Sequence, residues 1–228
     1  MMEKIMMLPS FWIENTPYDW GDLEEGQSHK YKKGQPLFLE GEKMKNVFLI
    51  KQGKIKLSIS NQEGNEKTVG YLGENSIVGT SSLFNNAEYM FNATAVTNSH
   101  LLKFDRDEFI HKVMSNEQLT QQIFKIMSLR IRILTNHALD LSFNHSFKRL
   151  ASALLEISET YGKVRNDGKI FIDFTITQRE ISELIGTTLV TVSNHLRKLM
   201  ELEIIEKQNQ QYIILDMEKL QKIANGNE

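Results

Sequence analysis

The stretch TITQREISELIGTTLVTVSNHLRKLMELEIIEK occupies Thr175–Lys207 and contains two runs in which apolar residues recur at helical spacing. The expected buried residues are Ile181, Leu184 and Ile185 in the first run and Val192, Leu196 and Leu199 in the second. Gly186 lies between the runs and permits a tight turn, because glycine adopts backbone angles that other residues avoid. Two short helices joined in this way have the shape that places one helix in a groove of DNA.

Both expected helices carry start signals. Thr177 is followed three residues later by Glu180, which is the spacing of a capping box, and Thr188 can cap the second helix. In a helix-turn-helix, outward side chains near the start of the second helix reach the base edges. The outward positions here are Leu189, Val190, Ser193 and Asn194, with Arg197 one turn further on. The alternative interpretation is a helical hairpin that binds no ligand.

The side chains of this segment predict what it would read. Leu189 and Val190 suit the thymine methyl group, and Asn194 can pair with adenine N6 and N7. Polar and basic side chains nearby would contact phosphates or supply local positive charge, namely Thr177, Gln178, Thr188, Arg197 and Lys198. A dimer presents two such helices about one DNA turn apart. We therefore expect double-stranded DNA with an A·T-rich palindrome as the partner.

The composition excludes several classes of protein. The chain has 228 residues, a formal net charge of −2, 40% hydrophobic residues and no cysteine. A folded core is therefore expected, any DNA contact must come from a local basic patch, and disulfides and thiolate metal sites are ruled out. The only apolar run near the start, Ile5–Leu8, is too short for a signal peptide, and no later run is long enough to span a membrane. We expect a soluble, cytoplasmic protein that has no membrane partner.

Glycine and proline divide the chain. All three prolines and nine of the 13 glycines lie between positions 9 and 79, and no glycine occurs from Thr80 to Tyr161. The first part should therefore consist of strands and turns, and the middle mostly of helix. Residues 62–65 form a hairpin turn signal between strands expected at 54–60 and 66–71, and further strands are expected near 90–95 and 99–104. This pattern predicts a small antiparallel β-sandwich or barrel.

From Asn116 the apolar period becomes helical. Leu119, Ile123, Ile126, Arg130, Ile133 and His137 are spaced as in the seam of a coiled coil. A second apolar stripe lies beside the seam and comprises Phe124, Met127, Ile131, Leu134, Ala138 and Leu141. We interpret the segment as a dimerisation helix whose first seam meets a second copy of the chain. The alternative is a single helix buried in the core of a monomer.

Residues 142–146 break the helical pattern and predict a hinge, with Ser146 as the N-cap of a helix over 147–161. A strand at 169–174 precedes the two short helices, and strands at 204–206 and 212–215 follow them. This order is that of a winged helix-turn-helix. The expected fold class is therefore α+β, with an N-terminal antiparallel β-roll at 1–115, a dimerisation helix and hinge at 116–145, and a winged helix-turn-helix at 146–228.

Two separate motifs carry a resemblance that covers nearly the whole chain. The segment ITQREISELIGTTLVTVSNHLRKL resembles the DNA-binding signature of the Crp–Fnr transcription regulators, and KKGQPLFLEGEKMKNVFLIKQGKIKLS resembles the cyclic-nucleotide-binding-type β-roll of that family. The resemblance implies an effector-responsive homodimer that binds DNA and works with RNA polymerase. Within the family, NSIVG, IFK and VTVS look most like the regulators of halogenated-aromatic respiration, which respond to chlorinated phenolic acids.

The resemblance also guides the choice of effector. Family members that bind cyclic AMP use an acidic residue and an arginine, but here Thr80 stands in the place of the acid, and Met90 and Phe91 cannot replace the arginine. Arg130 falls in the apolar seam, where an isolated charge is costly, so it needs an acid or an anionic ligand. We expect a small acidic aromatic effector and no cofactor, with a binding site formed by Tyr71, Thr80, Phe84, Tyr89, Phe91, Met127 and Arg130.

Other functions remain open at this point. Arg130 could form an ordinary interhelical salt bridge, and a cyclic nucleotide or a haem held by His100, His111 or His137 could be the effector. An enzyme built on a β-barrel is a further possibility, although no catalytic or phosphate-binding motif is present and Ser81 and Ser82 have no evident base. A ligand-binding or interaction protein without DNA-binding activity is the third class. The leading hypothesis is a transcription regulator that is not an enzyme.

Overall fold

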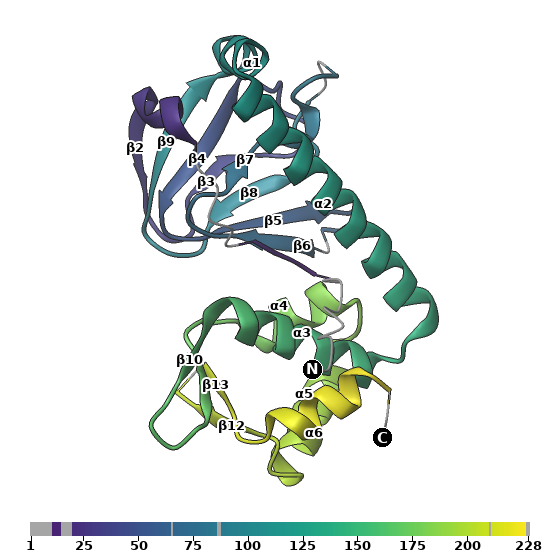
Figure 1. Cartoon of the computed structure of the whole chain (residues 1–228). Coiled ribbons are helices and arrows are strands. Elements are labelled where there is room, and N and C mark those ends of the chain that lie inside the picture. Colours follow the sequence, from purple (N-terminus) through teal and green to yellow (C-terminus); the bar gives the residue numbers. More distant parts are fainter. Residues whose placement is uncertain (1–10, 15–19, 65, 86–87, 210, 227–228) are drawn as a thin grey trace. The chain divides into compact units, whose positions relative to one another are not determined.

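The computed structural model describes residues 11–14, 20–64, 66–85, 88–209 and 211–226, which form two compact units (Figure 1). One unit contains Trp12–Ile131, and the other contains Arg132–Glu228, to which Phe11 also belongs. The boundary falls inside the long helix α2 (Glu117–Phe143), so this helix contributes to both units. The sequence analysis treated residues 116–145 as a segment of their own. The first unit is rich in strands and the second in helices, which confirms the α+β class.

The first unit is a β-roll of two sheets. Its strands are β1 (Trp12–Glu14), β2 (Gln27–Tyr31), β3 (Pro36–Phe38), β4 (Asn46–Gln52), β5 (Ile55–Ser60), β6 (Glu66–Leu72), β7 (Ile77–Val78), β8 (Asn92–Ala95) and β9 (Ser99–Asp105). One sheet has the order β1-β6-β5-β8-β3 and the other β2-β9-β4-β7. The pairings are antiparallel except that of β1 with β6. Fully buried side chains from both sheets form the core, among them Ile50, Ile55, Leu72 and Leu101.

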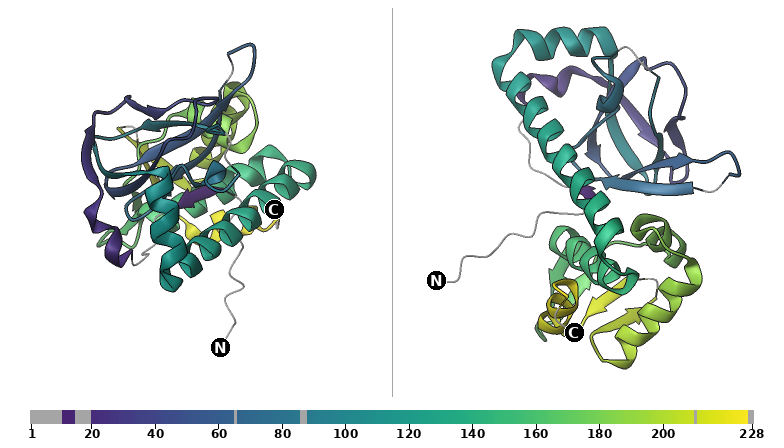
Figure 2. Two further views of the ribbon diagram at one scale, coloured as in Figure 1. Left: turned by 90° about the horizontal axis from the view of Figure 1, so that it is seen from above. Right: turned by 90° about the vertical axis from the view of Figure 1, so that its right-hand side faces the viewer.

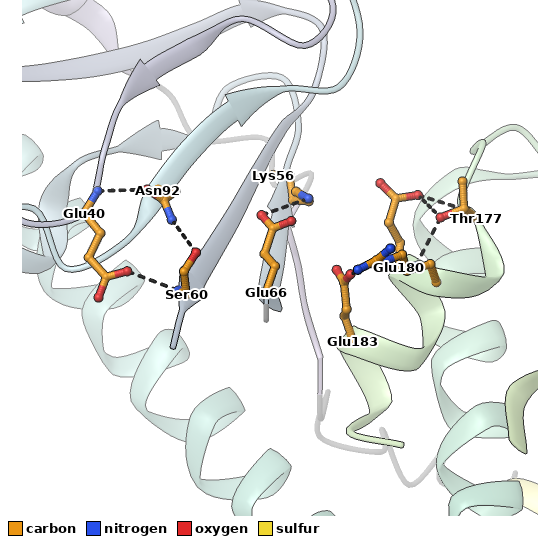
Figure 3. A network of polar contacts seen from close by, with 9 residues as sticks. Glu40, Lys56, Ser60, Glu66, Asn92, Thr177, Glu180 and Glu183 are labelled. Atoms are coloured by element: carbon orange, nitrogen blue, oxygen red, sulfur yellow. Dashed lines mark hydrogen bonds and ion pairs between the residues drawn. The ribbon is translucent and has the colours of Figure 1, made fainter. Parts of the chain in front are cut away.

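Polar contacts fix the turns of the β-roll. The Gly64 amide donates to the Asn61 carbonyl oxygen at 3.0 Å, and Gly64 has a φ of 80° in the turn that joins β5 to β6, as the sequence predicts. Ser60 at the end of β5 donates its amide to Glu40 at 3.2 Å and accepts from the side chain of Asn92 at 3.4 Å (Figure 3). These contacts join the β5 end to the segments around β3 and β8.

Two helical segments and two short 3₁₀ turns complete the unit. The 3₁₀ turns are η1 (Gly21–Glu25) and η2 (Thr80–Ser82), and α1 (Arg106–Ser115) follows β9. The sequence analysis did not predict α1, which Asp105 caps by accepting from the amides of Asp107 and Glu108 at 2.8 and 3.3 Å. Asn116 ends α1, and its side chain accepts from the Leu119 amide at 3.1 Å. The long helix α2 therefore starts where the change of period predicts.

The second unit is a winged helix-turn-helix. It contains α3 (Ser146–Tyr161), β10 (Gly162–Val164), β11 (Ile170–Ile172), α4 (Gln178–Ile185), α5 (Leu189–Glu201), β12 (Ile205–Gln208), β13 (Gln211–Ile214) and α6 (Met217–Ala224). Its strands form one antiparallel sheet in the order β10-β11-β13-β12. Figure 2 shows α3, α5 and α6 gathered beside this sheet. The strands expected at 169–174, 204–206 and 212–215 appear as β11, β12 and β13, whereas β10 and α6 were not predicted.

The start of α3 corrects one prediction. The N-cap is His145, whose Nδ1 accepts from the Lys148 amide at 3.3 Å, and not Ser146. The hydroxyl of Ser146 is hydrogen-bonded instead to Nε2 of His195 on α5 at 2.8 Å. The hydroxyl that the local pattern assigned to the cap is therefore hydrogen-bonded to a residue distant in sequence.

Phe11 joins the second unit through contacts with α3 and α2. Its amide donates to the Glu156 carboxylate at 2.9 Å, and its buried ring lies edge-on to His137 with 5.3 Å between the centroids.

Among the helices of the described residues, none combines the length and the apolar composition needed to cross a membrane.

We predict that Gly186→Ala destabilises the second unit, because Gly186 ends α4 with φ 64° and ψ 55° and a Cβ in this region costs about 1–2 kcal/mol. Gly186→Asn should cost less, since asparagine tolerates the left-handed region. Urea denaturation of both variants measures the difference. Equal stability of wild type and Gly186→Ala would contradict the assigned turn.

Candidate DNA interface and effector site

The first helix of the helix-turn-helix is held at its start by a complete capping box. The Thr177 hydroxyl accepts from the Glu180 amide at 3.1 Å, and the Glu180 carboxylate accepts from the Thr177 amide at 2.8 Å (Figure 3). Both contacts were predicted from the spacing of the two residues. The cap leaves Thr177 exposed and Gln178 half-buried at the start of α4, where they were expected to contact phosphates.

The second helix begins at the predicted cap and turns its predicted face to solvent. The Thr188 hydroxyl accepts from the Thr191 amide at 3.1 Å, while Val192, Leu196 and Leu199 are completely buried. The side chains of Leu189 and Val190 are 48% and 70% exposed. Ser193, Asn194, Arg197 and Lys198 are also exposed, so the structure places these six candidate base and phosphate contacts on the exposed side of α5.

Contacts within α5 orient two of these side chains. The Asn194 side-chain oxygen accepts from Nη2 of Arg197 at 3.1 Å. Arg197 also lies 3.8 Å from the carboxylate of Glu201 in an exposed ion pair, which contributes little to stability. An amide oxygen can accept two hydrogen bonds, so Asn194 keeps the donor and acceptor needed for adenine. The ammonium group of Lys198 lies 4.3 Å from the centroid of the Phe147 ring, at the edge of this face.

Arg149 on α3 is a residue that the sequence analysis missed. Its Nε donates to the Ile185 carbonyl at 2.8 Å, its Nη2 to Gly186 at 3.1 Å, and its Nη1 to Asn144 at 2.5 Å. These acceptors are the end of α4, the turn before α5 and the break between α2 and α3. Burial lowers the pKa of the Arg149 guanidinium, and the nearby Asp140 carboxylate opposes that effect.

The sequence contains no clear signal for Arg149. It lies in FKRLASALL, but helical spacing places it on the opposite side of α3 from Phe147, Leu150 and Ala151, which are buried on one face. Arg149 is buried as well because the rest of the unit packs around almost the whole of α3. What the pattern could not show is that the acceptors are three backbone carbonyls.

His195 lies on the side of α5 that faces α3. Its ring is 5.2 Å from that of Phe147, centroid to centroid, and its Nε2 is hydrogen-bonded to Ser146. Burial lowers the pKa of His195, and the positive charges of Lys198 and His145 lower it further. The imidazole therefore stays neutral at neutral pH and ties α5 to the first turn of α3.

In the β-roll, the expected effector site is a small closed pocket of about 10 Å³. Four of the predicted residues line it, namely Thr80, Tyr89, Phe91 and Arg130, and all four are buried. Ser81 and Met90 also line the pocket. Four apolar residues of β3, β5, β6 and β7 and the glycine after β7 complete the lining, namely Phe38, Leu57, Leu72, Ile77 and Gly79. This lining contains one cation and no carboxylate. The volume is about that of one water molecule.

Hydrogen bonds and ring stacking hold Arg130 and Tyr89 in the lining of this pocket. Arg130 is 8% exposed, and its guanidinium donates to the Thr80 hydroxyl and, at 2.9 Å, to the Ile77 carbonyl. The Tyr89 ring stacks on Phe38 with 3.7 Å between the centroids. The Tyr89 hydroxyl accepts from the Asn46 amide at 3.0 Å and donates to the Asn46 carbonyl at 2.8 Å. Burial raises the pKa of Tyr89, so its hydroxyl is neutral.

Three predicted effector residues do not line this pocket. Leu72 lines it, and Tyr71, the preceding residue of β6, projects to the opposite face of the sheet because side chains alternate along a strand. Phe84 is 48% exposed beyond η2, whereas its neighbour Leu83 is fully buried. Met127 is half-buried one turn before Arg130 on α2, but it is not part of the pocket lining. The expected set of aromatic residues around Arg130 is therefore smaller than predicted.

The burial of α2 corrects the assignment of its two stripes. Five of the six seam residues are buried within the chain, Arg130 anchors the seam to the β-roll, and His137 is half-buried. The second stripe is exposed, with Phe124 at 65%, Ile131 at 64%, and Leu134 and Leu141 above 40%. The sequence analysis gave the partner-facing role to the first seam, which was wrong. Both stripes fit helical spacing, and only burial distinguishes them.

Metal and haem ligands do not gather in the part of the chain that the structure describes. It contains no group of three His, Cys, Asp or Glu side chains that could hold a metal ion. The histidines considered for haem have other neighbours. Nε2 of His100 is hydrogen-bonded to the Ser28 hydroxyl at 2.8 Å, and His137 packs on Phe11.

A β-roll joined by a long helix to a winged helix-turn-helix defines a class of ligand-responsive transcription regulators. Residues 28–116 match the family described as "Cyclic nucleotide-binding domain", and residues 148–223 match that described as "Crp-like helix-turn-helix domain". The chain is 30% identical to the global nitrogen regulator of Nostoc sp. over 77% of this chain and 79% of that protein. The protein belongs to the Crp–Fnr family of DNA-binding transcription regulators.

Other relatives agree with this assignment. The chain is 25% identical to the CRP-like cAMP-activated global transcriptional regulator of Mycobacterium tuberculosis, over 85% of this chain and 86% of that protein. A solved structure of a CooA mutant from Carboxydothermus hydrogenoformans has the same fold, with a TM-score of 0.76 at 24% identity over 92% of each chain. The relatives named here are transcription regulators and not enzymes.

We predict that Ile131→Glu combined with Leu134→Glu converts a dimer to a monomer in analytical ultracentrifugation. These side chains are exposed in one chain, so charges there should block association without unfolding it. Lys125→Glu with Arg132→Glu, at exposed positions outside the stripe, is the matched control and should remain dimeric. A dimer that persists with both stripe charges would show that another surface mediates association.

We also predict that Arg149→Met destabilises the second unit by about 1.5–3 kcal/mol, because hydrogen bonds to a charged group contribute about that much and three buried or partly buried carbonyls lose their donor. Arg149→Lys should recover only part of the loss, since a single ammonium group cannot match the guanidinium fork. Chemical denaturation checks both. Arg179→Met, which removes the ion pair of an exposed arginine with Glu183, should change stability less than Arg149→Met.

Proposed function

We propose that this protein is a homodimeric regulator whose affinity for an A·T-rich inverted repeat is controlled by a small acidic aromatic compound bound beside Arg130. The observation that carries the proposal is the buried guanidinium of Arg130, which lies in the β-roll pocket and donates to two neutral oxygens. An anion could take the place of those acceptors with a stronger, charge-assisted contact. No cofactor is needed for this response.

The pocket lining favours an aromatic anion over other ligands. Phe38, Tyr89 and Phe91 supply aromatic surface next to the single cation. A ligand larger than a water molecule must displace some of these side chains, so binding has to open the site. Such opening can change DNA affinity only if the ligand prefers one arrangement of the regulator over the other. Arg130 is placed for that role, because it lies on α2, which continues to the break at Asn144.

Cyclic AMP is the less favoured effector. The residues that the sequence analysis compared with the cyclic-AMP site, Thr80, Met90 and Phe91, all line the pocket. They provide neither the acid for a ribose nor a second cation for the phosphate. The resemblance to regulators of halogenated-aromatic respiration supports a chlorinated phenolic acid, and we propose this branch as the nearest in function.

The DNA partner follows from α5 and from dimerisation. The exposed stripe of α2 supports a dimer with two-fold symmetry, and two copies of α5 would then meet successive major grooves. Leu189, Val190 and Asn194 favour thymine and adenine. As a DNA-bound regulator, the protein would act in the cytoplasm and contact RNA polymerase.

We predict that Asn194→Ala weakens the binding free energy for the cognate DNA by about 1–3 kcal/mol and relaxes discrimination at one base pair. Lys198→Ala should instead weaken all sequences similarly and reduce the salt slope by about one. In-vitro selection followed by fluorescence anisotropy at several salt concentrations measures both effects. A selected half-site centred on G·C pairs would overturn the base contacts while leaving the family assignment intact.

For effector binding, Arg130→Ala should weaken an acidic aromatic ligand by about 1.5–3 kcal/mol, the range for hydrogen bonds to charged groups. A thermal-shift screen with chlorinated and unchlorinated hydroxyphenylacetic acids, cyclic AMP and haem identifies the ligand, because binding to the folded state stabilises it. Calorimetry on wild type and Arg130→Ala then gives the affinities. The proposal would be contradicted by tight binding of cyclic AMP, or by equal affinity of wild type and Arg130→Ala for the acidic aromatic ligand.

A further inference from the structure

The helix-turn-helix unit contains a second pocket, which is separate from the β-roll. Its volume is about 320 Å³, at the lower end of the range for small-molecule sites. It lies among the start of α3, the end of α5, the start of β12 and the helix α6. The lining consists of Phe147, Lys198, Leu202, Ile204, Lys219, Lys222 and Ile223.

The pocket has an apolar floor and a basic rim. Phe147, Ile204 and Ile223 are buried at its base, and Leu202 forms a half-exposed wall. Lys198, Lys219 and Lys222 are exposed at its edge, and no carboxylate lines it. Asp216 pairs with Lys219 at 3.3 Å and caps α6 by accepting from the Lys219 amide at 2.9 Å. Lys198 and Lys222 therefore keep the rim positive.

We propose that this pocket binds an anionic amphiphile, such as a medium-chain carboxylic acid, with its apolar tail on the floor and its head group between Lys198 and Lys222. The charge of the rim selects an anion, and the apolar floor selects a tail that a simple phosphate or sulfate lacks. Binding lowers DNA affinity, because Lys198 lies at the edge of the DNA-facing side of α5 and its charge is taken up by the ligand.

The tail makes a specific contribution that can be measured. Each buried methylene raises a binding constant by about fourfold, so decanoate, with two more methylenes, should bind roughly fifteenfold more tightly than octanoate while the pocket still has room. The head group makes a second contribution. Decanol should bind at least about tenfold more weakly than decanoate, the ratio for one charge-assisted contact.

The experiment uses the full-length protein and decanoate below its micelle-forming concentration, with calorimetry as the readout. We expect one saturable site per chain. Lys222→Gln should weaken binding about tenfold, and Leu202→Glu should abolish it by placing a negative charge in the wall. Lys30→Gln, an exposed lysine on β2, is the charge-matched control and should bind as wild type does. Arg130→Ala should also bind normally, which separates this site from the β-roll effector.

Two results would overturn the site. One is equal binding of decanoate, decanol and decyltrimethylammonium, which would indicate an unspecific apolar surface. The other is equal affinity in wild type, Lys222→Gln and Leu202→Glu. For the effect on DNA, decanoate should weaken DNA binding, and saturating DNA should weaken decanoate binding by the same factor. Independent binding of the two ligands would contradict the role of Lys198.

Discussion

The guanidinium of Arg149 holds together the parts of the chain that have to be aligned for DNA reading. It donates to the carbonyl oxygens of Asn144, Ile185 and Gly186, which lie at the break after α2, at the end of α4 and in the turn before α5. Those carbonyls lie at or beside the ends of helices, where helical bonding leaves acceptors without donors. One planar cation with several donors can satisfy them together, whereas a single ammonium cannot. Arg149 therefore joins α3 to the end of α4 and to the turn before α5, and the contacts of His195 with Ser146 and Phe147 join α3 to α5 itself.

The β-roll uses the same chemistry for a different purpose. Arg130 also donates from a buried position to neutral oxygens, those of Thr80 and Ile77, but it lines a pocket and lies on the long helix. Tyr89 keeps that pocket small by stacking on Phe38 and bonding to Asn46. A ligand that enters must compete with contacts that are already satisfied. Such a site favours a charged ligand, because only a charge-assisted contact offsets the bonds that are lost.

The two faces of α2 differ in burial, one being part of the chain's own core and the other exposed to solvent. The buried seam is part of the chain's own core, and the exposed stripe leaves large apolar side chains such as Phe124 and Ile131 in solvent. A contiguous apolar surface of this kind is typical of a protein interface. Two-fold pairing through this stripe would give the DNA-reading helices a fixed relation to each other. An anion bound in the basic pocket beside Lys198, as we propose, would control the DNA-binding unit independently of the β-roll.

The sequence determined those features that local geometry encodes. Thr177 and Glu180 had to form a capping box at their spacing, Gly64 and Gly186 had to turn the chain, and the periods of α4 and α5 fixed which side chains are buried. Tertiary structure decided the other features, because they depend on residues that are distant in the chain. The two stripes of α2 have equivalent spacing, and only the packing of the β-roll decides which stripe is buried. Tyr71 does not line the pocket that Leu72 lines, because side chains alternate along a strand. Ser146 is hydrogen-bonded to His195 instead of capping α3. The acceptors of Arg149 lie up to 37 residues away in the chain.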